Sequence, residues 1–242
     1  CASCVLVRFD GVYMDCDVLL NGHIVCTHHY GYTAFGVDLT SRLLVGRNTL
    51  AVHVRHQSPN SRWYSGAGIY RDVTLHVLPK RHIPLDGVYV TTTHELESWT
   101  MTIDTELCGV KDNGVLTHVL LDGDVPVCDV TVEAAGDHAN AVMQVLSPKL
   151  WSPDAPNVYT LQTMLGNQVI RQNVGFRDLT FTTDRGLLVN GAPIKLHGVC
   201  LHHDLGCLGS AFHEKAMRRQ LRAMRQMGVN ALRTSHTPPA KQ

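Results

Sequence analysis

The residues best suited to chemistry lie in two short segments near the C-terminal end of the sequence. Cys200-Leu-His-His-Asp204 places two imidazoles beside a carboxylate, and Arg233-Thr-Ser-His-Thr-Pro238 adds a guanidinium and a third imidazole. Imidazole can donate or accept hydrogen bonds to sugar hydroxyls and can carry positive charge. A guanidinium can hold a carboxylate by two parallel hydrogen bonds. The pattern favours a binding site for a hydroxyl-rich ligand, with ordinary loop histidines as the alternative.

A zinc site is the competing interpretation of the same side chains. The ligands in this interpretation would be His202, His203, Asp204 and His236. No two of them are spaced i, i+4, the spacing that places two ligands on one helix face. We therefore assign no metal here.

The elements around the two segments predict one βαβ unit. Ile194–Val199 has the composition of a short strand, and Val229–Arg233 has that of a second one. Between them, Glu214–Met227 has apolar residues at i, i+4 and i+7, which predicts an amphipathic helix. Strands joined in this way are expected to be parallel, with a right-handed crossover. Both histidine segments would then follow the C-terminal ends of neighbouring strands, where (β/α)₈ barrels carry their active sites.

The chain before position 177 has the pattern of antiparallel β structure. Asn21-Gly22 between two apolar runs indicates a type I′ hairpin, and so does Asn190-Gly191 further on. Residues 49–55 and 72–78 alternate with period two, and short strands separated by turn residues continue from 87 to 165. Residues 79–84 are expected to form a linker. The spacing predicts small β-sandwiches followed by a β/α domain.

Composition limits the classes of partner. The chain has 242 residues, of which 44% are hydrophobic, so it can bury a packed core. Its 21 basic and 21 acidic residues cancel, which gives no electrostatic reason to expect a nucleic acid or an anionic membrane. No apolar run reaches the roughly 20 residues of a membrane span. The eight scattered cysteines favour buried free thiols over a disulfide framework.

Both ends of the sequence read as truncations, because the chain starts in a strand pattern without Met and stops in the barrel pattern. The sequence therefore does not decide whether a signal peptide precedes this chain. The compartment is left unassigned, with the cytoplasm preferred to secretion.

Long motifs along the whole chain resemble glycoside hydrolase family 2, and within it the β-galactosidases. Those that resemble its sugar-binding jelly-roll domain are Arg8–Met14, Leu20–His23 and Asn60–Arg71. Those that resemble the end of its immunoglobulin-like domain are Leu150–Leu161 and Val174–Arg177. Those that resemble the opening of its TIM barrel are Leu196–Asp204 and Gly228–Pro238.

The resemblance implies a multidomain, mainly β chain. A jelly-roll-type β-sandwich would occupy residues 1–79 and an immunoglobulin-like β-sandwich residues 80–177. Residues 178–242 would hold the first βα units of a (β/α)₈ barrel.

The implied activity is hydrolysis of terminal β-galactosides with retention, which needs two carboxyl groups about 5 Å apart. In the family both are Glu residues on later barrel strands, so they would lie beyond Gln242, and the chain alone is expected to be inactive. Asp204 reads as a rim residue, and Glu214 as an exposed residue of the first helical turn. The alternatives are a β-glucuronidase or β-mannosidase of the same family, or a non-catalytic carbohydrate-binding module.

The resemblance also implies roles for individual residues. His202 and His236 match the histidines that contact the sugar and stabilise the transition state, and Arg233 matches an arginine that supports the nucleophile region. His203 and Asp204 depart from the pattern of other branches of the family and are expected to play supporting roles.

The segment Asn60–Arg71 is expected to dock against the barrel, with Ser61 and Arg62 reaching toward the substrate. The implied partner is a β-galactoside or oligosaccharide. No cofactor can be assigned from the sequence. A full-length protein could bind Mg²⁺ or Na⁺, and it could form a homo-oligomer.

Overall fold

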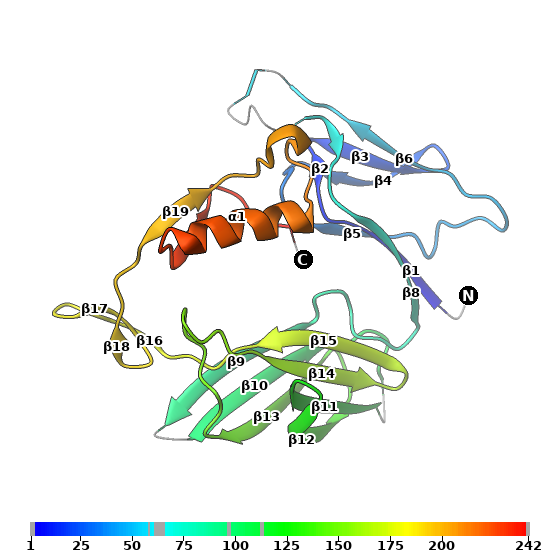
Figure 1. The fold of residues 1–242 in the computed structure, drawn as a ribbon. Helices are drawn as coiled ribbons and strands as arrows, with labels where there is room; N and C mark the ends of the chain where they lie inside the picture. Colours follow the sequence, from blue (N-terminus) through cyan, green and yellow to red (C-terminus); the bar gives the residue numbers. More distant parts are fainter. Residues whose placement is uncertain (1–2, 58, 61–65, 96–97, 112–113, 241–242) are drawn as a thin grey trace. The chain divides into compact units, whose positions relative to one another are not determined.

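The structure is a computed structural model that describes residues 3–57, 59–60, 66–95, 98–111 and 114–240. The chain forms two compact units (Figure 1). Unit 1 joins Cys1–Pro79 to Leu196–Gln242, and unit 2 is the continuous segment Lys80–Lys195.

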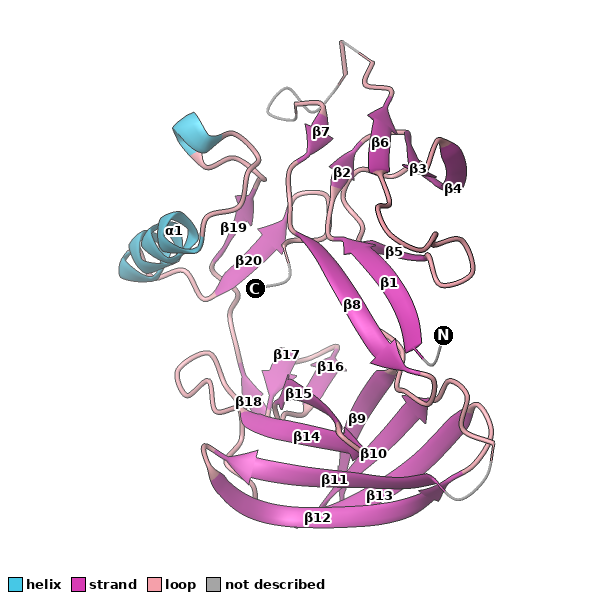
Figure 2. Ribbon diagram, turned by 90° about the vertical axis from the view of Figure 1, so that its right-hand side faces the viewer, coloured by secondary structure: helices cyan, strands magenta, loops and turns pink. Residues whose placement is uncertain are grey.

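The first part of unit 1 is a β-sandwich. Its strands are β1 (Ser3–Phe9), β2 (Val12–Tyr13), β3 (Cys16–Leu20), β4 (His23–His28), β5 (Phe35–Asp38), β6 (Leu50–Val54), β7 (Gly68–Ile69) and β8 (Val73–Pro79). One sheet has the order β5-β1-β8, another β4-β3-β6, and β2 pairs with β7 (Figure 2). Val7 and Phe9 from the first sheet pack in one core with Val18 and Leu20 from the second. The two sheets therefore bury their inner faces against each other.

Asparagine–glycine turns connect strands in both units, as predicted. Asn21 and Gly22 have φ of 51° and 82° between β3 and β4. Asn190 and Gly191 have φ of 52° and 76° between β17 (Gly186–Val189) and β18 (Ala192–Pro193). Positive φ at both central residues is what a type I′ turn requires.

The second part of unit 1 is the predicted βαβ unit. Strand β19 (Gly198–Leu201) leads through a 3₁₀ turn, η1 (Gly206–Leu208), to α1 (Glu214–Gln226), and β20 (Ala231–Thr234) follows. The two strands pair in parallel, with Gly198 opposite Ala231. We expected the first strand at 194–199, but it begins four residues later, at Gly198. Its partner β20 begins only at Ala231, so residues 194–197 have no ladder partner among the described residues. The handedness of the crossover stays a prediction.

The larger part of unit 2 is an immunoglobulin-like sandwich with seven strands among the described residues. They are β9 (Val88–Glu95), β10 (Ser98–Glu106), β11 (Gly114–Asp122), β12 (Val125–Ala134), β13 (His138–Leu146), β14 (Tyr159–Leu165) and β15 (Gln168–Val174). The sheet β13-β10-β9 faces the sheet β12-β11-β14-β15 across a core that includes Trp99, Ile103, Leu161 and Phe176. The three-plus-four arrangement is that of constant-type immunoglobulin domains.

Residues 178–195, which we expected to open the barrel, group with unit 2 by their contacts. They form a small sheet of β16 (Leu179–Thr182), β17 and β18. Asn190 ties this sheet to the sandwich, because its Nδ2 donates to the backbone oxygen of Trp151 at 3.0 Å. The predicted domain boundary at 177 stays a prediction.

The linker expected at residues 79–84 is in large part built into unit 2. The side chain of Ile83 is fully buried in a core cluster with Leu107 and Leu116. Its backbone nitrogen donates to Oε1 of Gln168 at 2.7 Å. Burial of Ile83 therefore anchors the segment, and only its first residues serve as a connection.

The cysteines of the described residues are free thiols, as predicted, but they are not uniformly buried. Cys16 lies in the sandwich core, whereas Cys200 and Cys207 are exposed. In the same part of the chain, no helix has both the length and the apolar character that crossing a bilayer requires.

Candidate functional site

The two faces of the β19–β20 sheet have different surroundings. Leu201 lies opposite Thr234 in the register, and both line a cavity together with Met217 and Leu221 of α1. Side chains alternate between faces along a strand, so the neighbouring pair, Cys200 and Arg233, points to the face away from the helix. Because the helices of a (β/α)₈ barrel lie outside its strands, this second face corresponds to the barrel interior.

His202 and His236 meet at the C-terminal edge of this sheet. Their ring centroids lie 5.8 Å apart and the rings are nearly perpendicular, at 89°. His202 comes directly after β19 and His236 two residues after β20, and both side chains are exposed. The parallel pairing thus brings together two residues that are 34 positions apart in the chain.

Arg233 fixes the protonation pattern of His236. Its Nη2 lies 3.0 Å from Nδ1 of His236. A guanidinium only donates hydrogen bonds, so this Nδ1 must be an unprotonated acceptor. The neutral ring therefore carries its proton on Nε2.

His203 points in another direction and forms part of an internal contact. Nη2 of Arg71, from the sandwich, donates to its Nδ1 at 3.2 Å, and its Nε2 faces the backbone oxygen of Thr237 at 3.5 Å. Burial, followed by the charge of Arg71, lowers the pKa of His203 below its ordinary value. His203 is thus a neutral structural residue between the two loops.

The two carboxylates of the barrel opening are held by local partners. Oδ1 of Asp204 accepts a hydrogen bond from the backbone nitrogen of Gly206 at 2.9 Å. Oε1 of Glu214 pairs with Nε of Arg218 one helical turn later, at 2.6 Å. Both contacts favour structural roles for these side chains.

Arg71 is the site residue that sequence reasoning did not single out. It is the last residue of the Asn60–Arg71 motif, for which docking against the barrel was predicted, and its bonds to His203 and to the Pro238 oxygen show that docking at this end of the motif. The only signal in the sequence was its place in that motif. Ser61 and Arg62, expected to reach toward the substrate, lie outside the described residues.

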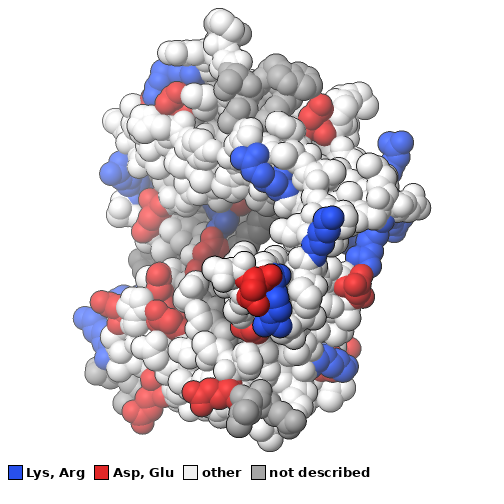
Figure 3. Space-filling model, turned by 90° about the vertical axis from the view of Figure 1, so that its left-hand side faces the viewer, with Lys and Arg blue, Asp and Glu red and all other residues white. Residues whose placement is uncertain are grey.

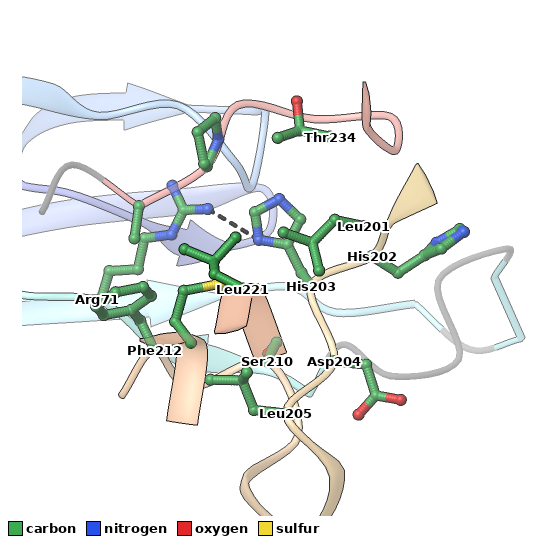
Figure 4. A pocket seen from close by; sticks show the side chains of 13 residues that line it. Arg71, Leu201, His202, His203, Asp204, Leu205, Ser210, Phe212, Leu221 and Thr234 are labelled. Atoms are coloured by element: carbon green, nitrogen blue, oxygen red, sulfur yellow. Dashed lines mark hydrogen bonds between the residues drawn. The ribbon is translucent and has the colours of Figure 1, made fainter. Parts of the chain in front are cut away.

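A cavity of about 240 Å³ lies behind the histidine loop, on the helix side of the sheet. Most of its wall is apolar, with Leu205, Phe212 and Leu221 among its lining residues. His202 points away from the other labelled side chains (Figure 4). His202 is itself one of the lining residues, but the wall is mainly apolar, and we do not assign the cavity to a sugar.

Cys200 is a further site residue that was not predicted. Hydrogen bonds with Ser235 and then Arg233 lower the pKa of its thiol below the ordinary value. Across the described chain, no three His, Cys, Asp or Glu side chains gather closely enough to hold a metal ion. On the face shown in Figure 3, acidic and basic side chains are interspersed, and neither sign forms a continuous patch.

Comparison with family models gives three matches, in chain order. The sugar binding domain of glycosyl hydrolases family 2 matches residues 2–79. The model described as glycosyl hydrolases family 2 matches residues 82–177, and that family's TIM barrel domain matches residues 181–242.

Two curated relatives illustrate the similarity. The chain is 37% identical to beta-galactosidase BoGH2A of Bacteroides ovatus, over 97% of this chain and 30% of the relative. It is 34% identical to a putative beta-glucuronidase of Formosa agariphila, over 96% of this chain and 24% of the relative. The chain thus spans less than a third of the length of either relative.

Comparison with solved structures shows the same similarity. A beta-glycosidase from Bacteroides vulgatus superposes with a TM-score of 0.89 at 34% identity, covering 98% of this chain and 32% of that one. A glycosyl hydrolase family 2 member from Bacteroides cellulosilyticus gives 0.90 at 32% identity, covering 99% and 33%.

Proposed function

This chain belongs to glycosyl hydrolase family 2, and from this premise we propose that it builds one wall of the active site of a retaining β-glycosidase. The observation that carries the proposal is the meeting of His202 and His236 at the C-terminal ends of two parallel strands. Both are exposed there.

The chemistry required is cleavage through a transition state that resembles an oxocarbenium ion. Hydrogen-bond donors aimed at the sugar oxygens stabilise that state when their positions are fixed in advance. His236 meets this requirement, since Arg233 holds its proton on Nε2. His202, whose ring is perpendicular to that of His236, would contact a different part of the same sugar.

The catalytic carboxylates belong to the remaining barrel strands in this proposal. Retaining hydrolysis needs two of them about 5 Å apart. Asp204 and Glu214 are bound to Gly206 and Arg218 respectively, so neither is assigned as nucleophile or acid. Asp204 supports the loop instead.

We propose a terminal β-galactoside as the substrate, supported by the 37% identity to a relative named as a beta-galactosidase. A β-glucuronide is the second candidate, because a relative at 34% identity is named as a putative beta-glucuronidase. The two candidates differ at C4 and C6 of the sugar, and no described side chain discriminates between them.

The test is hydrolysis of chromogenic β-galactoside, β-glucuronide and β-mannoside by the full-length protein, with the 242-residue chain alongside. Cleavage of the galactoside alone, with a silent short chain, supports the proposal. Cleavage of the glucuronide or the mannoside instead would identify that glycoside as the substrate in place of the galactoside. A folded full-length protein that cleaves none of the three favours a carbohydrate-binding module.

Variants connect the activity to the paired histidines. His202→Ala and His236→Ala should each lower kcat/KM by about 100-fold, the loss typical of one fixed transition-state donor. His23→Ala changes an exposed histidine of the β3–β4 hairpin and should leave activity unchanged. Equal activity in all three variants would contradict the assignment.

A further inference from the structure

We infer that Arg71 is a positioning residue that holds both histidine loops from the neighbouring sandwich. The inference rests on the proposed function for its meaning in catalysis. Its geometric basis lies wholly within unit 1.

One guanidinium bonds to four acceptors in different segments. Nη1 of Arg71 donates to the backbone oxygens of Tyr32, at 3.1 Å, and Asp10, at 3.4 Å. Nη2 donates to the backbone oxygen of Pro238 at 2.9 Å and to Nδ1 of His203 at 3.2 Å. Figure 4 shows the contact with His203 as a dashed line. Half of the fork therefore holds the sandwich and the other half holds the barrel opening.

The two barrel acceptors are close in sequence to the paired histidines. His203 follows His202 directly, and Pro238 lies two residues after His236. Fixing His203 and the Pro238 carbonyl therefore limits the backbone freedom of the residues that carry the paired rings. In this way Arg71 acts on both rings without touching either of them in the described contacts.

Neighbouring contacts reinforce this arrangement. The ring of Tyr32 lies 5.4 Å from that of His203, and the guanidinium of Arg71 lies 5.1 Å from the ring of Tyr70. Since Nδ1 of His203 accepts from Arg71, its proton is on Nε2, which faces the Thr237 oxygen at 3.5 Å. His203 thus links the loop after β19 to the loop after β20.

Lysine cannot reproduce this contact. Its ammonium is a single point on a flexible stem, whereas the planar fork presents donors in two fixed directions. Arg71→Lys keeps the charge and removes the fork, so it separates geometry from electrostatics. Arg55→Ala is the matched control, because Arg55 pairs with Asp17 in the same sandwich and does not contact the loops in the described bonds.

The first experiment measures the steady-state kinetics of the full-length enzyme. Arg71→Ala and Arg71→Lys should each lower kcat at least tenfold with a smaller change in KM, and Arg55→Ala should retain wild-type kcat. Combining Arg71→Ala with His203→Ala should cost less than the product of the two single losses, since both changes break the same link. Full activity of Arg71→Lys, or strictly multiplicative losses, would overturn the inference.

The second experiment needs no activity. Nitrogen-15 NMR of the imidazoles in the 242-residue chain should show shifted His202 and His236 signals in Arg71→Ala and unchanged signals in Arg55→Ala. Unchanged signals in a folded Arg71→Ala chain would also overturn the inference. If the wild-type enzyme cleaves no glycoside, the proposed function fails, while the imidazole signals still decide the role of Arg71.

Discussion

Nη2 of Arg233 lies 3.0 Å from Nδ1 of His236, and this contact fixes which ring nitrogen of the histidine carries the proton. Arg233 and His236 are three residues apart, one inside β20 and the other just after it. The strand that delivers the ring therefore also sets its hydrogen-bonding direction.

Removing this contact should weaken catalysis without unfolding the protein. Arg233→Ala frees the tautomer and orientation of His236, and a charge-assisted hydrogen bond of about 1.5–3 kcal/mol corresponds to roughly a 10- to 100-fold loss of kcat. The measurement is kcat of the full-length enzyme, with exposed Arg222→Ala on α1 as the control. Equal rates in the two variants would refute the role of Arg233.

Asp204 should tolerate loss of its charge. Its Oδ1 accepts a backbone hydrogen bond from Gly206, and the amide oxygen of Asn can accept the same bond. Asp204→Asn should therefore retain kcat within about tenfold, whereas a nucleophile would lose several orders of magnitude on this change. An inactive but folded Asp204→Asn enzyme would show that the carboxylate takes part in the reaction.

His118 should make unit 2 sensitive to acid. The side chain is fully buried, its Nδ1 lies 2.9 Å from Oγ1 of Thr163, and burial lowers its pKa to about 4. The unfolded chain takes up this proton near pH 6.5, so the contribution to stability is complete above pH 6.5 and falls as pH drops toward 4. A histidine pKa lowered to this extent corresponds to about 3 kcal/mol in the free energy of unfolding.

The acid effect can be measured by the fluorescence of Trp99 and Trp151, which both lie in unit 2, in a Trp63→Phe background. Urea unfolding at pH 7 and pH 4.5 should show a smaller difference in His118→Gln than in the parent. His138→Gln, at an exposed histidine paired with Asp104, is the control. The same pH difference in all three proteins would contradict the assignment to His118.

Two glycines of similar backbone conformation should differ in their tolerance of a methyl group. Gly109 and Gly123 have φ of +68° and +63°, so alanine is strained at both by about 1 kcal/mol. At Gly109 a Cβ would also collide with the backbone oxygen of Lys80, while at Gly123 it meets nothing within 4 Å. Gly109→Ala should therefore lower the free energy of unfolding of unit 2 by more than about 2 kcal/mol. Equal urea-unfolding midpoints for Gly109→Ala and Gly123→Ala would show that the backbone at Lys80 moves aside for the added methyl group.

Local signals were the part of the fold that the sequence predicted well. The Asn21-Gly22 and Asn190-Gly191 turns depend only on which residues accept positive φ. Helix α1 depends on a period of 3.6 in a single segment, and the parallel pairing of β19 with β20 follows from the order of the elements. Each of these features is decided by neighbours in the chain.

Strand β15 was not predicted, because its inner face is only partly apolar. Gln168 and Gln172 alternate with Ile170 and Val174 on that side, so the period-two signal is weak. The strand pairs with β14 alone, at the edge of its sheet. Edge strands need fewer apolar residues, which makes them hard to detect from sequence.

The contacts of Arg71 could not be predicted for a different reason. Its partners His203 and Pro238 lie 132 and 167 residues away, and no local pattern marks such contacts. For the same reason the sequence indicated only a supporting role for His203, and not that its ring bonds to Arg71 and faces the Thr237 oxygen.

The split of unit 1 around the continuous segment Lys80–Lys195 bears on how the chain matures during synthesis. Unit 2 is complete once Lys195 has left the ribosome, so it can fold while the barrel opening is still being translated. Arg71 is made early but acquires its last acceptor only when Pro238 emerges. Until His203 emerges, its guanidinium has only the acceptors of the sandwich, and both barrel acceptors are synthesised after the whole intervening unit 2.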